Sequence, residues 1–334
     1  MDIDKIIENA HSGREVTKKD CVDMLYLEDT SEETLKIRAA ATNIVRKRNG
    51  NAGYIFAQIG VSCMPCEGNC KFCSFGKDHS VVGKIKLSDE DIIRKIRELD
   101  YGGKLYGLYL MTMHNYDIEH FLHCVRLIKS NLTGPTQIYS NVGDTSYDDF
   151  VRMKESGVDG VYHCWRLGEG KDTRLDPEQR KQTIFNALKA GLKVLDALEP
   201  IGPEHTPEEM TEHIFFSKKI NSFQCGAMGR VNVPGTIFEG KPKVTELTLS
   251  KYEAAMTLTF SSMKRMPIMG IHEPNLLGYL SGANMITAES GVNPRDIIPD
   301  TENNRGLSIT KCREMLKMAG FTKLVLGNDT VINI

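Results

Sequence analysis

Long apolar runs and a strong net charge are both missing from this chain of 334 residues. No stretch approaches the roughly twenty apolar residues that a membrane-spanning helix needs, so we expect no membrane span. The formal net charge is only −2, which provides no broad field for nucleic acid or for a membrane surface. Residues 1–9 are amphipathic and acidic rather than apolar, so we expect no secretory signal peptide. These absences predict a protein that contacts neither membranes nor nucleic acid.

A disulfide framework is also lacking. The cysteines number nine, an odd count, and six of them are scattered, at Cys21, Cys63, Cys124, Cys164, Cys225 and Cys312. Because nothing points to an oxidising compartment, we expect a reduced, cytoplasmic protein. No low-complexity linker divides the chain, and its 40% hydrophobic and 26% charged residues are ordinary for a globular protein with a sizeable core.

Apolar segments alternate with amphipathic helical segments through most of the chain. The predicted strands are residues 54–59, 105–111, 136–141, 159–164, 192–197, 223–231, 266–271 and 283–288. The predicted helices between them are residues 88–99, 117–130, 146–156, 177–189, 207–219 and 250–264. This repeat predicts an α/β fold in the form of a (βα)8 TIM-type barrel of parallel strands. A doubly wound open sheet is the alternative.

We predict three parts in the chain. Residues 1–50 form an N-terminal helical extension, residues 51–300 form the barrel, and residues 301–334 form a C-terminal helix and cap, with a small hairpin in 324–334. Helix starts are indicated by capping residues, with an N-cap followed by a proline at Asp176-Pro177. The other predicted caps are Thr30, Ser88, Thr206 and Ser250.

The stretch Cys66-Glu-Gly-Asn-Cys70-Lys-Phe-Cys73 carries the strongest chemical signal. Three soft thiolates on one short loop suit an iron–sulfur cluster. The loop lacks a fourth ligand, so a four-iron cluster held there would keep one iron open. A zinc site is the alternative, with Cys63 as a fourth ligand, but no second pair of cysteines or histidines is visible. Because the loop follows the first predicted strand, it falls on the catalytic face of a barrel.

The C-x3-C-x2-C spacing, with the aromatic Phe72 before the last cysteine, resembles the signature of the radical S-adenosylmethionine (SAM) superfamily. The resemblance implies a [4Fe-4S] cluster on Cys66, Cys70 and Cys73, which are both metal ligands and catalytic residues, with Phe72 beside the cofactor. It also implies SAM on the open iron and its reductive cleavage to a 5′-deoxyadenosyl radical. The electron would come from a donor such as ferredoxin or flavodoxin, and the exposed iron suggests an anaerobic host.

Three landmarks make residues 50–320 similar to the biotin synthase branch, namely Ala190-Gly-Leu-Lys-Val194, Pro234-Gly-Thr236 and Ser281-Gly-Ala-Asn284. That branch includes biotin synthase, a hydrogenase maturase, methylornithine synthase and an enzyme of pyridinol-cofactor assembly. By position, the resemblance implies SAM-binding roles for Ser140, Asn141, Arg166, Glu169, Arg180, Ile201 and Gly202. Arg180 has an alternative as a solvated helix arginine, and Ser140 and Asn141 have one as turn caps.

Polar residues near the expected ends of later strands are candidates for binding a small polar substrate, namely Asp196, Glu199, His272, Glu273, Asn275, Glu289 and Arg295. The carboxylates have an alternative as solvated loop residues, and His272 has one as a structural histidine.

The chain also departs from its relatives. The positions of the three cysteines that hold a second cluster in biotin synthase fall near Leu110, Tyr139 and Leu195, and a glycine-rich motif for the amine of SAM is replaced by Met111-Thr-Met-His114-Asn115. We therefore predict a radical SAM enzyme of cofactor biosynthesis that abstracts hydrogen from a small polar substrate and leads to rearrangement or to carbon transfer, as a transferase. Sulfur insertion and a non-catalytic iron–sulfur scaffold are the alternatives.

Overall fold

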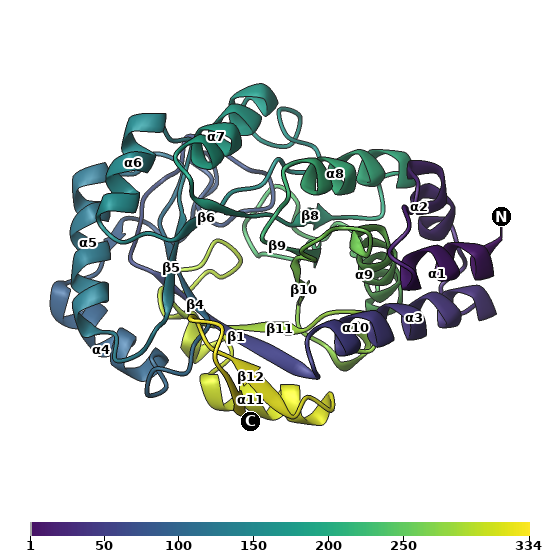
Figure 1. The fold of residues 1–334 in the computed structure, drawn as a ribbon. Coiled ribbons are helices and arrows are strands. Elements are labelled where there is room, and N and C mark those ends of the chain that lie inside the picture. The colour runs from purple at the N-terminus through teal and green to yellow at the C-terminus, as the bar shows by residue number, and fades with distance from the viewer. Residues whose placement is uncertain (1) are drawn as a thin grey trace.

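The computed structural model describes residues 2–334 and contains a closed barrel of parallel strands (Figure 1). In order around the ring the strands are β1 (Ala52–Gly60), β4 (Gly107–Met111), β5 (Gln137–Asn141), β6 (Gly160–Tyr162), β7 (Lys193–Leu195), β9 (Gln224–Gly229), β10 (Ile268–His272) and β11 (Met285–Gly291). The ring closes because β1 pairs in parallel with both neighbours, Gln58 lying opposite Tyr109 on one side and Glu289 on the other. The predicted (βα)8 barrel is confirmed, and the open sheet is excluded.

Helices surround the barrel on the outside (Figure 1). They are α4 (Asp89–Leu99), α5 (Ile118–Asn131), α6 (Tyr147–Glu155), α7 (Pro177–Lys189), α8 (Pro207–Lys219), α9 (Glu246–Phe260) and the short α10 (Leu276–Tyr279). Their apolar faces and the outward faces of the strands form the main core. Three short strands add to this frame: β2 (Ser62–Cys63) and β3 (Ile85–Lys86) form an antiparallel ribbon, and β8 (Leu198–Ile201) pairs with β9.

The N-terminal segment forms three helices that lie beside α9 (Figure 1). These are α1 (Ile3–His11), α2 (Lys18–Leu25) and α3 (Glu32–Arg48). Buried Arg38 of α3 donates to the carbonyl of Leu247 at 2.7 Å, and Lys251 of α9 pairs with Asp29 at 2.9 Å. The expected helical extension is therefore present, while its division from the barrel at residue 50 stays a prediction.

The C-terminal segment continues from β11 through η1 (Thr301–Asn303) and α11 (Ile309–Met318) to β12 (Lys323–Val325) and β13 (Val331–Asn333). The last two strands pair antiparallel, so the predicted hairpin is confirmed. β12 also pairs in parallel with the first residues of β1, which ties the hairpin to the lower rim of the barrel, where the amino ends of the strands lie.

Two of the predicted helix starts are wrong. The N-cap of α3 is Ser31 rather than Thr30, and α9 begins at Glu246 with Thr245 as its N-cap rather than at Ser250. Ser250 lies inside the helix, where its hydroxyl donates to the carbonyl of Leu247 at 2.8 Å. The prediction at Ser250 was wrong because a serine with a glutamate three residues later occurs both at helix N-caps and inside helices. The caps at Ser88, Asp176 and Thr206 are confirmed.

Aromatic side chains fill the lower half of the barrel interior. Phe56 stacks on Tyr109 with ring centres 5.3 Å apart, and Tyr139 lies 5.9 Å from both rings. The hydroxyl of Tyr109 donates to Oε1 of Gln224 at 2.8 Å, where the apolar layer gives way to polar side chains. The candidate active-site cavity lies between this layer and the carboxyl ends of the strands.

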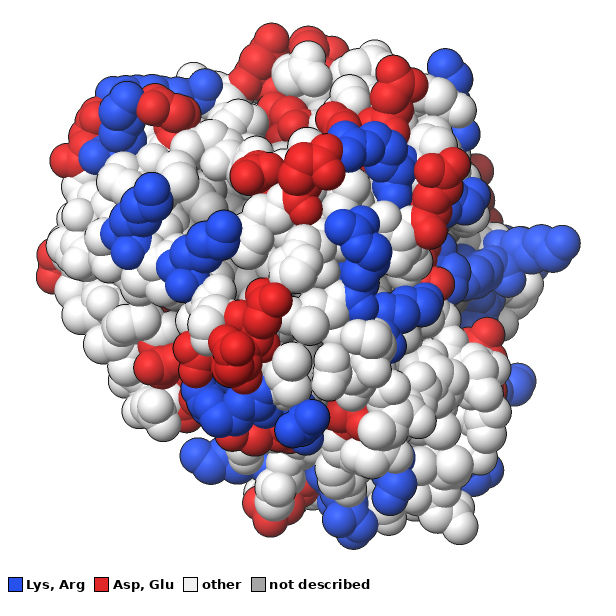
Figure 2. All heavy atoms as spheres, turned by 90° about the vertical axis from the view of Figure 1, so that its left-hand side faces the viewer, with Lys and Arg blue, Asp and Glu red and all other residues white. Residues whose placement is uncertain are grey.

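The outer surface carries charges of both signs. Figure 2 shows lysine, arginine, aspartate and glutamate side chains scattered over the face formed by α4, α5 and α6, in keeping with the small net charge. Within residues 2–334, no helix combines the length and the apolar character that crossing a bilayer requires.

Candidate active site

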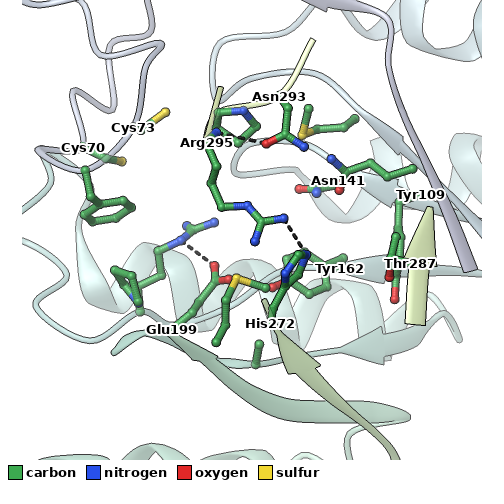
Figure 3. A pocket seen from close by; sticks show the side chains of 18 of the residues that line it. Cys70, Cys73, Tyr109, Asn141, Tyr162, Glu199, His272, Thr287, Asn293 and Arg295 are labelled. Carbon is green, nitrogen blue, oxygen red and sulfur yellow. Dashed lines mark hydrogen bonds and ion pairs between the residues drawn. The ribbon is translucent and has the colours of Figure 1, made fainter. Parts of the chain in front are cut away.

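The cysteine loop directly follows β1 and β2 and is held by backbone hydrogen bonds. The amide of Cys66 donates to the carbonyl of Phe75 at 2.7 Å, and the amide of Cys73 donates to that of Cys70 at 3.1 Å. The amide of Ser74 donates to the carbonyl of Pro294 at 2.9 Å, which fastens the loop to the segment after β11. All three predicted cysteine ligands line one cavity at the carboxyl ends of the strands, and Figure 3 labels Cys70 and Cys73.

The donor set fits a cluster better than a single metal ion. Burial raises the pKa of Cys70 to about 12, and burial together with the neighbouring Cys70 raises that of Cys73. Across residues 2–334, no three His, Cys, Asp or Glu side chains surround a common point as the ligands of one ion would. In a four-iron cluster each thiolate binds a different iron, so its ligands stand further apart, and the positive irons would stabilise the thiolates.

Cys63 does not join this set. Its thiol donates to the carbonyl of Gly83 at 3.5 Å, and the side chain is buried outside the cavity. The zinc alternative therefore lacks its fourth ligand. Phe72, by contrast, lines the cavity and packs against Phe238, with ring centres 6.5 Å apart.

Arg180 lies in the first turn of α7 and is buried against the cavity wall. It donates through Nη1 to Asp144 at 3.0 Å and through Nη2 to the carbonyl of Cys164 at 3.1 Å. Burial alone would raise the pKa of Asp144, but its hydrogen bond with His163 and the charge of Arg180 hold it well below the ordinary value. Arg180 is thus a paired, buried residue and not the solvated arginine of the alternative.

Arg166 lies on the same side of the cavity and has fewer partners. Its Nε donates to Oε1 of Glu199 at 2.8 Å, while the hydroxyl of Tyr162 donates to Oε2 of the same carboxylate at 2.7 Å. Burial alone would lower the pKa of Arg166, but Glu199 and Glu169 raise it, so the guanidinium stays charged. After burial, which raises the pKa of Cys70, the largest effect on that pKa is the positive charge of Arg166, which lowers it.

The other residues predicted to bind SAM are distributed unevenly. Asn141 lines the cavity at the end of β5, whereas Ser140 is buried outside the cavity. Glu169 lies behind the wall, where it accepts from the amide of Arg166 at 3.1 Å. Ile201 and Gly202 are also outside, and the cavity is lined instead by Ala197, Glu199 and Pro200 from the same segment.

The opposite wall carries a charged network from β10, β11 and the segments after them (Figure 3). Nη2 of Arg295 donates to Nε2 of His272 at 2.6 Å and to Oε1 of Glu289 at 2.7 Å. Since a guanidinium has no acceptor, this contact makes Nε2 of His272 an acceptor and puts the ring proton on Nδ1. Behind them, Arg305 bridges Oε2 of Glu289 at 2.6 Å and Glu273 at 3.1 Å.

Within this network, Arg295, His272 and Glu289 line the cavity, and Glu273 and Arg305 support them from outside. Burial alone would raise the pKa of Glu289, but the charge of Arg295 keeps it well below the ordinary value. In Figure 3 the side chain of Arg295 extends into the cavity toward His272.

Besides Glu273, two more of the predicted substrate residues do not line the cavity. Asp196 accepts from the hydroxyl of Ser217 on α8 at 2.5 Å, and burial raises its pKa to about 6. It therefore belongs to the layer between barrel and helices. Asn275 caps α10, accepting from the amide of Gly278 at 2.8 Å. Both lie near strand ends, as predicted, but their side chains are used by neighbouring helices.

Several polar residues of the cavity were not predicted from the sequence. Tyr109, Tyr162, Gln224, Thr287, Asn293 and Arg230 all line it. A usable signal was present for some of them, because Gln224 and Thr287 are polar residues within apolar strands, where an inward-facing polar side chain indicates the barrel interior. Arg230, which pairs with Glu204, follows β9 in a loop and carries no such signal.

Comparisons with known proteins agree with this geometry. No family model matches the chain. Among curated proteins, biotin synthase of Pelotomaculum thermopropionicum is 24% identical over 264 residues, covering 76% of this chain and 80% of its own. Cyclic dehypoxanthine futalosine synthase of Halalkalibacterium halodurans is 28% identical over 211 residues, which cover 58% of this chain and 56% of the relative.

Solved structures share the fold at lower identity. Methylornithine synthase matches with a TM-score of 0.78 at 18% identity, over 95% of this chain and 96% of its own. The FeFe-hydrogenase maturase HydG of Carboxydothermus hydrogenoformans matches with a TM-score of 0.78 at 16% identity, over 96% and 78%. Both resemblances concern the fold of the barrel. In sequence the chain is therefore similar to biotin synthase and in fold to methylornithine synthase and HydG, and with its three-cysteine loop it resembles the enzymes of the radical SAM superfamily in the biotin synthase-like branch, which use a [4Fe-4S] cluster and S-adenosylmethionine.

Proposed function

We propose that this enzyme binds a small polar substrate in the upper barrel and removes a hydrogen atom from it, in a rearrangement or carbon-transfer step of cofactor biosynthesis. One observation carries the proposal: the three cysteines of the loop and the charged β10–β11 wall open onto the same cavity. When bound, the cluster and SAM supply the electron and the 5′-deoxyadenosyl radical that such chemistry needs.

Arg166 is our candidate for holding the carboxylate of SAM. Its Nε is used by Glu199, but within residues 2–334 no hydrogen-bond partner is found for its two Nη groups. Two parallel N–H groups on a rigid guanidinium match a carboxylate. Arg180 is less suited to this role because Asp144 and the carbonyl of Cys164 already occupy both of its Nη groups.

The substrate would lie against β10 and β11. Arg295 extends a cation into the cavity, His272 and Glu289 hold it in place, and Asn293 donates to Glu289 at 3.0 Å. This arrangement favours a substrate with an anionic group, which Arg295 would bind. The aromatic layer of Phe56, Tyr109 and Tyr139 closes the cavity from below and would keep water from reactive intermediates.

The decisive experiment is an anaerobic one. The protein is reconstituted with iron and sulfide, both are quantified, and SAM and dithionite are added. We expect about four irons per chain and 5′-deoxyadenosine that is lost in Cys70→Ala. A fully loaded cluster that forms no deoxyadenosine, even after cell extract is added as a source of substrate, would leave the scaffold alternative.

Sulfur insertion is the second candidate, because the curated relatives include biotin synthases. A sacrificial second cluster would need its own ligands, yet Tyr139 and Leu195 are fully buried among the aromatic side chains of the lower barrel. Among residues 2–334, the thiols that line the cavity are those of Cys66, Cys70 and Cys73. About eight irons per chain, instead of about four, would revive this candidate.

A cytoplasmic location and reduction by a ferredoxin or flavodoxin remain part of the proposal. The electron donor is tested by asking whether a reduced flavodoxin replaces dithionite in the deoxyadenosine assay, and the location by finding the protein in the soluble fraction of its host.

A further inference from the structure

A second cavity lies at the opposite end of the barrel, around the amino ends of the strands. Tyr54, Tyr106 and Phe223 line it from β1 and from the residues just before β4 and β9. The loop of residues 263–267 before β10 completes the wall, with Arg48 at the end of α3 and Asp329 in the C-terminal hairpin. The aromatic layer inside the barrel separates this cavity from the candidate active site.

Cations gather at this opening around one aromatic ring. The guanidinium of Arg265 lies 3.5 Å from the ring centre of Phe223, and the ammonium group of Lys193 lies 4.4 Å from it. Arg265 also donates to the carbonyl of Phe223 at 3.0 Å, and Lys193 donates to Gln137 at 2.7 Å, so both cations are held in place. Lys264 adds a third positive charge to the rim.

These cations have no carboxylate partner. Within residues 2–334, no Asp or Glu oxygen lies within 4.0 Å of the charged nitrogens of Arg265, Lys193 or Lys264. The charges of two acids act on Lys193: Asp329, which accepts from the hydroxyl of Tyr106 at 3.4 Å, and Asp159, which accepts from the amide of Ile138 at 2.8 Å.

The arginines of the upper cavity, which is the candidate active site, differ from these cations because they are paired with carboxylates. Arg166, Arg180 and Arg295 each have a carboxylate oxygen within 3.0 Å. Partly buried cations are costly unless they are paired, so Arg265 on the cavity wall and Lys193 beside the same phenyl ring favour an anionic partner. Burial lowers the pKa of Lys193, and an anion bound beside it would raise it again.

We propose that the lower opening of the barrel binds a small oxyanion, the phosphate or carboxylate group of a metabolite, at Arg265, with Lys193 adding positive charge from beside Phe223. The flat side chains of Tyr54 and Tyr106 meet edge to face, with ring centres 5.0 Å apart, and supply an apolar wall for the rest of such a ligand. This site is independent of the cluster and of the function proposed above.

The test uses the full chain with its cluster and two probes, pyrophosphate and citrate, at low ionic strength. Binding is measured by calorimetry for the wild type, Arg265→Met, Lys193→Met and the control Lys5→Met. Lys5 is exposed on α1 and lines neither cavity. We expect saturable binding of at least one probe, weakened about tenfold or more in the first two variants and unchanged in the control. The stronger probe identifies the chemistry as phosphate or carboxylate.

The proposal is overturned if neither probe binds by about 10 mM, or if both cavity variants bind as tightly as the wild type. A measurement on the wild type alone guards against variants that fail to fold. Phenylglyoxal modifies exposed arginines, and we expect the bound probe to protect Arg265 but not Arg174, which is exposed near the cysteine loop. Equal modification of Arg265 with and without the probe would also refute the site.

Discussion

Replacing Arg166 by methionine tests how the upper cavity is built. The substitution keeps most of the side chain's length but removes the charge that Glu199 faces at 2.8 Å. The side chain of Glu199 is only 8% exposed, so its carboxylate would keep the hydroxyl of Tyr162 and lose its ion pair. Removing one partner of a buried pair costs about 3–5 kcal/mol of unfolding free energy. We expect a loss near 3 kcal/mol, because Arg166 itself is 20% exposed.

A second effect separates the binding role from the structural one. If Arg166 holds the carboxylate of SAM, its loss removes charge-assisted hydrogen bonds of about 1.5–3 kcal/mol each, so affinity for SAM falls at least about tenfold. Glu199→Gln breaks the same pair from the other side and leaves the guanidinium free. That variant should lose stability while it keeps most of its affinity for SAM.

The assays are urea unfolding, equilibrium binding of SAM to the reconstituted protein, and 5′-deoxyadenosine formation. Arg174→Met is the matched control, because Arg174 pairs with Asp78 near the same loop but is 55% exposed, and exposed pairs contribute less than about 1 kcal/mol. SAM binding that is unchanged in Arg166→Met, with only stability reduced, would refute the carboxylate assignment. Full stability would refute the buried ion pair.

Three further predictions concern other parts of the molecule. Cys63→Ser should retain about four irons per chain and full deoxyadenosine formation, because its thiol faces the carbonyl of Gly83; an iron count that falls would make Cys63 a ligand. Burial raises the pKa of Glu253, so the folded state binds more protons than the unfolded state and the free energy of unfolding falls as pH rises above the ordinary pKa. Glu253→Gln should remove this contribution to the pH dependence, measured by urea unfolding between about pH 5 and 8. An unchanged pH dependence would contradict the prediction. In Gly226→Ala the new methyl group would overlap the backbone of β10, so the variant should lose several kcal/mol of unfolding free energy or soluble expression. Gly240 lies in open space at φ +76°, so Gly240→Ala should lose only about 1 kcal/mol. Equal melting temperatures of the two variants would refute the close approach of the strands.

Glu199 and Asp196 illustrate what the order of residues does not reveal about side-chain direction. Glu199 and Asp196 are three residues apart after β7, and from the sequence alone they were equivalent candidates. The fold directs Glu199 to Arg166 and Tyr162 in the cavity and Asp196 to Ser217 of α8. Side chains at the end of a short strand do not keep a simple alternation, so their direction depends on the packing of the following segment.

Arg305 illustrates a second limit. It lies 32 residues after Glu273 in the chain, yet it bonds both carboxylate oxygens at 3.1 Å and reaches Glu289 as well. No local motif marks it, because its role arises only when the segment after β11 folds back over the strand ends. The same holds for Arg265, in the loop before β10, and Lys193 of β7, which both contact the ring of Phe223.

The sequence by itself determined the barrel, the cysteine loop and its place at the catalytic face. Each of these depends on short-range regularities, namely alternating strands and helices, capping residues and three thiols within eight positions. Only the tertiary structure decided which polar side chains share the upper cavity, which cations at the lower opening have no carboxylate partner, and where α9 begins. Those features depend on burial and on contacts between segments far apart in the chain, which the order of residues does not display.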